Sequence, residues 1–235
     1  MPAVKPDVNP PRPNRQRTRS RRTREKIVHA ALERFSADGY VATTLEAIAA
    51  QAGVAVQTVK FVFHTKAELL LEVIASAATD DQARPTLEQP WFLEATGAAN
   101  GHRALALIVE FGTAIYERLA PLVAAIAAAA TLDEEVAAQR TKTLAARRAG
   151  MARVIQALHR SGELTSDLDI DRATDVMFVL QSPENLHAFT ATCGWPVHHY
   201  KAWEYKTLCT ALLSRTSRAA RLQSTNDLSY GAFVQ

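Results

Sequence analysis

Cysteine is scarce in this sequence, with only Cys193 and Cys209 among 235 residues. Two thiols form neither a disulfide framework nor a four-cysteine zinc site, and their scarcity is typical of a reducing cytosol. Cys193 also lacks a basic neighbour in the sequence that would favour the reactive thiolate of a redox sensor. The sequence therefore excludes the class of small disulfide-stabilised secreted proteins.

A metal site is also poorly supported. His187 and Cys193 precede the adjacent pair His198 and His199. Neighbouring residues of a helix point about 100° apart, so the two histidines of this pair cannot easily share one ion. We expect no metal site and no cofactor.

Glycine and aromatic residues are few, with nine glycines and 7% Phe, Trp and Tyr, whereas alanine is abundant. Runs that alternate apolar and polar residues, as half-buried strands do, are hard to find. An alanine-rich, glycine-poor chain favours helix, and a hydrophobic content of 48% is enough for a packed core. The predicted fold class is all-α.

Long apolar runs are missing too. The longest, residues 119–132, is shorter than a membrane span and suits a buried core helix. The N-terminus has no hydrophobic segment of the kind found in signal peptides. We therefore expect no membrane association and a cytoplasmic protein.

Sequence motifs of common enzymes are absent as well. No G-x-S-x-G, Walker or dinucleotide-binding fingerprint occurs. Acidic clusters at residues 133–135 and 167–171 are typical of helix starts, where carboxylates complement the helix dipole. We expect no enzymatic activity.

Positive charge is concentrated at one end of the chain. The first 26 residues hold nine Lys or Arg against two acidic residues, a net charge of +7, and the remainder has a net charge of −4. The beginning of the chain is too rich in proline to fold alone. We predict that residues 1–20 form a disordered basic arm, which is either simply solvated or becomes ordered on a polyanion such as DNA.

Apolar residues at helical spacing predict a first helix over residues 21–37. Thr43, three residues before Glu46, matches a capping box, so a second helix should start near Thr44. A turn at Gly53 and a short third helix complete a helix-turn-helix pattern.

A fourth helix should follow, with Thr65 as its N-cap and Glu68 as the capping-box partner. The polar, proline-containing stretch 79–91 predicts a boundary between domains. The predicted division is a basic arm over residues 1–20, a DNA-binding domain over 21–80, a larger helical domain over 81–214 and a loose tail over 215–235.

The larger domain should contain four long helical segments, over residues 101–130, 132–160, 169–190 and 196–214. Pro121 and Pro183 should kink or break two of them, because proline removes a backbone donor. Pro196 suits the first turn of the last helix.

Many positions between residues 24 and 70 follow one known pattern: Ile27, Ala30, Ala31, Phe35, Gly39, Tyr40, Thr43, Thr44, Ile48, Ala49, Ala52, Gly53, Val54, Thr58, Phe63, Lys66 and Leu69. In these positions the segment resembles the DNA-binding domain of the tetracycline-repressor (TetR) family. The rest of the chain resembles that family only in layout. The resemblance implies an N-terminal helix-turn-helix domain of three helices and a larger helical domain for ligand binding and dimerisation.

The resemblance also implies how the third helix, over residues 55–61, meets DNA. It would lie in the major groove with its first residues, Ala55, Val56, Gln57 and Thr58, nearest the base edges. Gln57 can pair with adenine through two hydrogen bonds, and the methyl groups of Val56 and Thr58 can pack on thymine methyls.

Thr44 and Lys66 match family positions that hold backbone phosphates, contacts that set register rather than sequence. Lys60 stands where the family usually has tyrosine; lysine keeps a phosphate donor and adds a charge, but it loses the aromatic plane. One more neutralised phosphate should steepen the slope of log K against log salt concentration by about 0.9. The same surface has three further candidates for DNA contact: Phe61, His64 and Arg22.

The family normally forms two-fold dimers through its last two long helices, here residues 169–190 and 196–214. Their apolar stripes are Ile170, Ala173, Val176, Val179 and Leu180 on the first, and Tyr200, Trp203, Leu208 and Leu212 on the second. Either stripe could instead pack within one chain. The resemblance also implies an effector cavity among the central helices, for which large or adaptable apolar residues are candidates: Phe111, Tyr116, Met151, Met177 and Phe178.

The sequence thus predicts a ligand-responsive transcriptional regulator, a repressor that binds a palindromic operator as a homodimer. Its partners would be double-stranded DNA and a small-molecule effector. Two alternatives remain open. One is a non-specific DNA binder driven by the basic arm and Lys60, and the other is a protein-interaction module that keeps the fold without recognising DNA.

Overall fold

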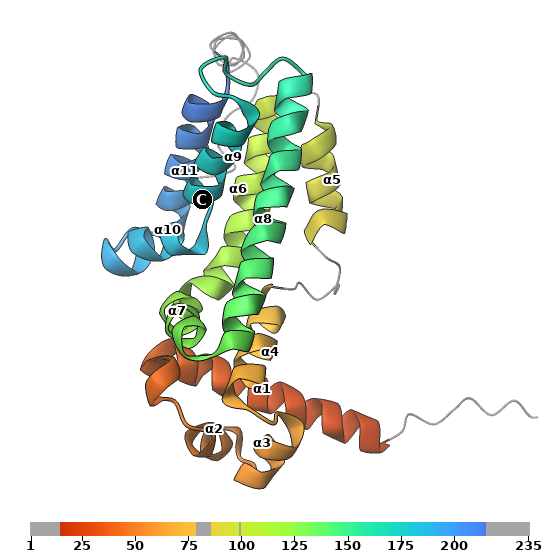
Figure 1. The fold of residues 1–235 in the computed structure, drawn as a ribbon, viewed down its shortest axis with the longest axis vertical. Helices are drawn as coiled ribbons and strands as arrows, with labels where there is room; N and C mark the ends of the chain where they lie inside the picture. Colours follow the sequence, from red (N-terminus) through yellow and green to blue (C-terminus); the bar gives the residue numbers. More distant parts are fainter. Residues whose placement is uncertain (1–14, 79–85, 99, 215–235) are drawn as a thin grey trace, which may run out of the picture.

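The computed structural model describes residues 15–78, 86–98 and 100–214. The described residues are almost entirely helical, and their one β-bridge joins Leu164 to Leu213. Most of the predicted basic arm, much of the predicted domain boundary and the predicted tail after residue 214 lie outside the described residues. Figure 1 shows two groups of helices, α1 to α4 at one end and α5 to α11 at the other. The second group forms the longer part of the chain and is called the longer helices below.

Helix α1 (Arg15–Ala42) is longer than the predicted 21–37. Its backbone leaves helical geometry at Gly39, where φ is +75°, so the predicted stop is a kink after which one more short turn follows. Only glycine adopts this left-handed conformation without strain. The buried face carries Ile27, Ala31 and Phe35, as the apolar spacing predicts.

The helix-turn-helix pattern is confirmed. Helix α2 (Leu45–Ala52) ends at Gly53, which has φ +66° in the left-handed cap, and α3 (Val56–Val62) follows after a short turn. Helix α4 (Lys66–Ala78) completes this group.

The predicted capping box at Thr43 is wrong. The N-cap of α2 is Thr44, whose hydroxyl accepts a hydrogen bond from the Ala47 N–H at 3.1 Å. Thr43 is buried and donates its hydroxyl to the Gly39 carbonyl at 2.6 Å, so it ties the turn to the end of α1. Both threonines fit a cap by sequence, and only the direction of the chain after Gly39 selects one of them.

The second predicted cap is confirmed in part. The Thr65 hydroxyl accepts a hydrogen bond from the Glu68 N–H at 2.9 Å, as an N-cap does. The Glu68 carboxylate, however, accepts from the N–H of His64 at 3.0 Å, one residue before the cap. The carboxylate thereby satisfies a donor outside the helix rather than the N-cap donor of a standard capping box.

The predicted break at Pro121 is confirmed. Helix α6 (Gly101–Leu119) passes into a 3₁₀ turn, η2 (Ala120–Leu122), and then into α7 (Val123–Leu132). Helix α8 (Glu134–Arg160) follows. A 3₁₀ turn, η1 (Thr86–Glu88), and helix α5 (Pro90–Gly97) were not predicted, because their sequence is short and begins with polar and proline residues.

The run Gly101–Leu132 is long and apolar enough to cross a membrane by length and composition alone. Its first part, α6, packs against α4, α5, α10 and α11, and it buries Leu105 and Ile108 in the core of the longer helices. A core helix passes the same test of length and composition.

The predicted break at Pro183 is confirmed, and the segment 169–190 is not one continuous helix. The chain forms α9 (Ile170–Leu180), turns at Gln181, where ψ is 74°, and continues as α10 (Pro183–His187) and a π-helical turn, η3 (Ala188–Thr192). The Gln181 side chain enters the core and donates to the Ile108 carbonyl at 3.2 Å. Gly112 makes this possible, because a Cβ at that position would collide with the Gln181 amide.

The last helix, α11 (Val197–Leu212), has Pro196 as its N-cap residue, one position before the predicted first turn. Its buried face, with Leu208 and Leu212, packs into the core formed with α5, α6, α8 and α9. A different hydrophobic cluster joins α1 to α4 with η2 and α7, through Leu122, Ala125 and Ala129.

Candidate nucleic-acid interface

Helix α3 presents a mixed surface at the free end of the helix-turn-helix domain (Figure 1). Its inner side is fixed by Val59, which is fully buried, and by the following Phe63, whose ring is also fully buried. Its outer side leaves Gln57 and Lys60 exposed, and Phe61 is 84% exposed. The hydrophobic spacing therefore orients the helix, and the orientation leaves these three side chains at the surface.

The remaining candidates of the first turn lie on the same short segment. Ala55 is exposed and serves as the N-cap residue without a side-chain hydrogen bond. Val56 and Thr58 are half-buried. The N-terminus of α3 is thus not closed by a side chain, and its first backbone donors point out of the helix.

Lys60 forms an ion pair within the motif. Its Nζ lies 3.5 Å from Oε1 of Glu46, in the first turn of α2, and both side chains are about half exposed. Sequence reasoning assigned Glu46 to a cap and missed this contact. The signal was weak, because the crossing of α2 and α3 decides which of their side chains meet.

Lys66 is held by the protein itself. Its Nζ donates to the carbonyl of Tyr40 at 2.7 Å and to the carbonyl of Thr43 at 3.0 Å, and it lies 4.3 Å from the centre of the Tyr40 ring. Burial lowers the pKa of the Lys66 ammonium. The side chain therefore joins the start of α4 to the turn between α1 and α2, close to the cap at Thr44.

Two further basic side chains of α1 differ in their surroundings. Arg24 pairs with Glu72 of α4, with Nη2 3.0 Å from Oε2, and its guanidinium lies over the Phe63 ring. The hydrogen bond with Glu72 raises the pKa of Arg24. Arg22 is exposed, and the described residues include no ion-pair partner for it. Sequence reasoning named Arg22 and missed Arg24, which has a structural role.

His64 is exposed at the start of α4. Its backbone N–H donates to Glu68, and its Nδ1 lies 3.2 Å from the same carboxylate. These hydrogen bonds lower the pKa of Glu68.

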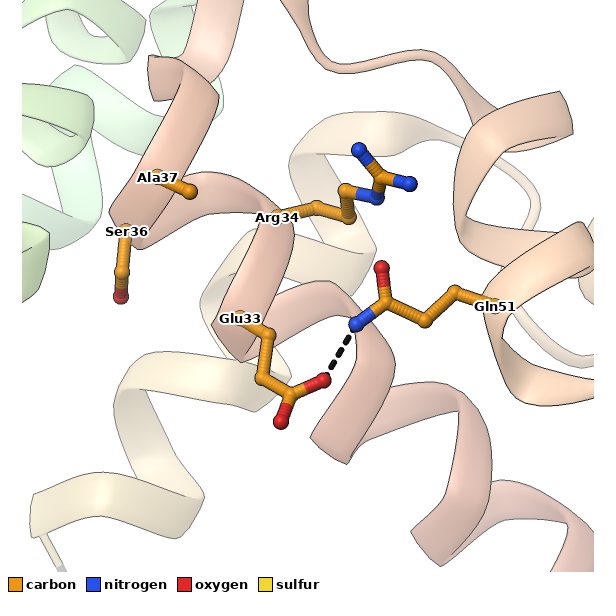
Figure 2. Close-up of a pocket in the computed structure, with 5 residues that line it drawn as sticks. All are labelled: Glu33, Arg34, Ser36, Ala37 and Gln51. Atoms are coloured by element: carbon orange, nitrogen blue, oxygen red, sulfur yellow. Dashed lines mark hydrogen bonds between the residues drawn. The ribbon is translucent and has the colours of Figure 1, made fainter.

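A shallow hollow lies between α1 and α2 (Figure 2). Glu33 of α1 accepts a hydrogen bond from the side-chain amide of Gln51, and Arg34 pairs with Asp38 at 3.1 Å. Ser36 and Ala37 complete the lining. None of the side chains predicted to meet DNA or effector lies in this hollow.

The five predicted effector residues do not line one described pocket. Met151 and Met177 are buried in the core of the longer helices. Phe111 is 41% exposed and stacks on Trp91. Phe178 lies against the guanidinium of Arg147, 3.8 Å from it.

Tyr116, the fifth candidate, belongs to a buried polar cluster that sequence reasoning missed. Glu204 of α11 is 1% exposed and accepts hydrogen bonds from the hydroxyls of Tyr200, at 2.8 Å, and Thr113, at 3.1 Å. Burial raises the pKa of Glu204 to about 7 and also raises the pKa of Tyr116. A glutamate in a helical sequence is typical of an exposed position, so only the packing of α11 on α6 reveals it.

Most of the predicted dimer stripes are used within the chain. Tyr200, Leu208 and Leu212 of α11 and Ala173 of α9 are buried in the described chain. Val179 of α9 is the exception, with 63% of its surface exposed.

Residues 27–73 match the family model of the bacterial regulatory proteins of the tetR family. No curated protein matches the sequence. The structure is similar to that of the SmeT–triclosan complex, with a TM-score of 0.62 and 18% identity over 83% of this chain and 93% of that chain. It is also similar to a HlyIIR mutant protein with a linker substitution, with a TM-score of 0.61 and 19% identity over 82% of this chain and 96% of that one.

A third similar structure is a TetR transcription regulator from Haloarcula marismortui, with a TM-score of 0.59 and 16% identity over 81% of this chain and 98% of that one. At these identities the likeness is one of fold. It extends over both groups of helices.

Proposed function

We propose that the chain is a ligand-responsive transcriptional repressor, because residues 27–73 match the family model of the bacterial regulatory proteins of the tetR family. It would act as a homodimer on a palindromic operator in the cytoplasm. The observation that carries the proposal is the exposed outer side of α3 at the free end of a matched helix-turn-helix domain.

Base recognition would come from the first turn of α3. Gln57 is exposed, and a glutamine amide matches the donor and acceptor that adenine presents in the major groove. Val56, Thr58 and Ala55 supply short apolar contacts for thymine methyl groups. The exposed ring of Phe61 would pack on the sugar-phosphate wall of the groove.

Backbone contacts would surround this turn. The N-terminal ends of α2, at Thr44, and α4, at Lys66, carry backbone donors that suit phosphate oxygens. Arg22 adds an exposed cation on α1, and His64 lies at the entrance to α4. Such contacts fix the register of the helix on the duplex.

The longer helices, in the region proposed as residues 81–214, would bind the effector and a second subunit. The SmeT structure named above is a complex with triclosan, which supports the proposal of a small-molecule effector. The candidates Phe111, Tyr116, Met151, Met177 and Phe178 would supply its apolar and aromatic groups, although they do not line one described pocket. Because the inner faces of α9 and α11 are buried within the chain, dimerisation would use their outer faces, including Val179.

A ligand acts on DNA binding only if it prefers one of two arrangements of the helix-turn-helix domains in the dimer. Helix α7 packs against α1, and the cluster containing Leu122 and Ala125 is shared with the helix-turn-helix domain. A shift of α6 and α7 on ligand binding would therefore tilt α1 and move α3. A coupling free energy of about 1–3 kcal/mol would change operator affinity between fivefold and about 150-fold.

The test is selection of the purified protein against a random pool of duplex DNA at physiological salt, followed by sequencing of the retained DNA. An enriched palindrome is the expected result, and Gln57→Ala should relax the preference at one base pair of each half-site by about 1–3 kcal/mol. Gln51→Ala is the matched control, because Gln51 is exposed on the side of α2 that faces α1. Retention without a consensus would indicate non-specific binding, and no retention would indicate a protein-interaction module.

A further inference from the structure

The helix-turn-helix motif carries an unusual distribution of charge. Glu46 is the one charged residue in the sequence of α2, and Lys60 is the one charged residue in the sequence of α3. The two meet across the turn, with Nζ and Oε1 3.5 Å apart. The motif that would enter the major groove is therefore electrically neutral, and both of its charges belong to one ion pair.

Glu46 lies at the positive end of a helix. Glu46 is the second residue of α2, directly behind the Thr44 cap, where the partial positive charge of the helix N-terminus stabilises an anion. The Lys60 side chain, in the last turn of α3, reaches back to it. The carboxylate is thus held at the N-terminus of α2 in the absence of DNA.

A DNA phosphate would have to compete with this carboxylate for Lys60. If Lys60 moved to a phosphate, Glu46 would be left unpaired among the negative charges of the duplex. Electrostatic repulsion therefore favours an ion pair that persists when the domain binds DNA.

We propose that Glu46 is a positioning residue: its ion pair holds the Lys60 ammonium against the helix-turn-helix motif and prevents it from neutralising a DNA phosphate. This inference rests on the proposed function, because it concerns the way the same surface binds DNA. It also explains how lysine is tolerated at this position: its charge adds nothing to the attraction that all DNA sequences share.

The salt dependence of DNA binding measures the number of neutralised phosphates, so it tests the inference directly. We would measure dissociation constants of the full chain for one operator duplex and one random duplex between about 50 and 200 mM salt. The variants are Lys60→Gln, Glu46→Gln and the double variant, each checked for helix content by circular dichroism. Glu135→Gln is the matched control, since Glu135 is also the exposed second residue of a capped helix, α8.

We expect the effect of Lys60→Gln on the salt dependence to differ between the chain with Glu46 and the Glu46→Gln variant. Lys60→Gln alone should leave the slope of log K against log salt unchanged, because the ammonium does not reach a phosphate. Glu46→Gln should steepen the slope by about 0.9, which corresponds to roughly eightfold tighter binding at about 0.1 M salt. In the Glu46→Gln background, Lys60→Gln should reverse that change, and Glu135→Gln should have no effect.

Two results would overturn the inference while leaving the proposed function intact. If Lys60→Gln makes the slope shallower by about 0.9 in both backgrounds, Lys60 binds phosphate regardless of Glu46. If Lys60→Gln changes the slope in neither background, Lys60 never reaches a phosphate, and Glu46 does not prevent that contact. Absence of DNA binding by every protein, the unmodified chain included, would instead reject the proposed function.

Discussion

At the scale of single residues, Glu204 is the most unusual group in the longer helices. A buried carboxylate is stable only when its hydrogen bonds are satisfied, and here two hydroxyls donate to it without a cation in contact. The charge of Lys201 lowers the pKa of Glu204 only as a minor effect, and the Lys201 ammonium is bonded at 3.0 Å to Glu110. Burial therefore dominates, and the pKa of Glu204 rises to about 7.

This pKa predicts a loss of stability as the pH increases. The folded state holds the proton of Glu204 up to about pH 7, whereas the unfolded chain releases it near 4.5, the ordinary pKa of a glutamate. The stabilisation is complete below pH 4.5 and disappears as the pH rises through about 7, a change of about 3 kcal/mol. Glu204→Gln keeps the shape and both hydrogen-bond partners, so its stability should not decline over this range.

Denaturant unfolding of the two proteins at about pH 5 and about pH 8, on either side of most of this titration, checks the prediction. The difference in unfolding free energy between Glu204→Gln and the unmodified protein should favour the variant at the higher pH and shrink at the lower one. A difference that does not change with pH would show that Glu204 is ionised throughout.

At the scale of elements, Lys66 holds the turn between α1 and α2. Three segments meet at its ammonium: the end of α1 at Tyr40, the turn before α2 at Thr43 and the start of α4. The carbonyls at the end of a helix have no partners within it, so a lysine that bonds one of them stabilises the termination. The residue that the family resemblance assigns to a phosphate also has a structural role.

Lys66→Met should therefore destabilise the protein even without DNA. Loss of two charge-assisted hydrogen bonds and the contact with the Tyr40 ring should lower the unfolding free energy by about 2–3 kcal/mol. Lys26→Met, at an exposed position of α1, should change it by less than about 0.5 kcal/mol. Chemical denaturation followed by circular dichroism would compare the two, and equal stabilities would mean that Lys66 has no structural role.

At the scale of the whole molecule, the two groups of helices share packing. Leu122 is fully buried, and the cluster around it joins α1 to α4 with α7 and the start of α8. Arg118 of α6 also donates to the carbonyl of Ala77 in α4 at 2.7 Å. Contacts of this kind make the stability of one part depend on the other.

We expect the described parts to unfold together. All three tryptophans lie outside α1 to α4: Trp91 is in α5, Trp195 is in the loop before α11 and Trp203 is in α11, whereas circular dichroism reports on every helix. Fluorescence and circular dichroism should therefore give one coincident transition in denaturant. Leu122→Ala should lower the unfolding free energy by about 3 kcal/mol and separate the two transitions.

Leu132→Ala is the control for this variant, because Leu132 ends the same helix, α7, with 66% of its surface exposed. It should change the unfolding free energy by less than about 0.5 kcal/mol. Separate transitions in the unmodified protein would contradict the expected coupling.

The sequence by itself determined most of the helices, but not α5 or the turn at Gln181 between α9 and α10. Periodic apolar residues such as Ile27, Phe35 and Val59 define helix faces, and Gly53 and Pro121 mark a turn and a break at the expected positions. These features depend on neighbours along the chain, so local rules predict them. The same local pattern over residues 27–73 matches the family model of the bacterial regulatory proteins of the tetR family.

Only the tertiary structure decided which side chains meet. The choice of Thr44 over Thr43 as cap, the ion pair of Glu46 with Lys60 and the burial of Glu204 all depend on residues far apart in sequence or on the exact exit of a helix. The turn at Gln181 depends on the space left by Gly112, about 70 positions earlier in the chain. Crossing angles and packing set these contacts, and no local pattern contains that information.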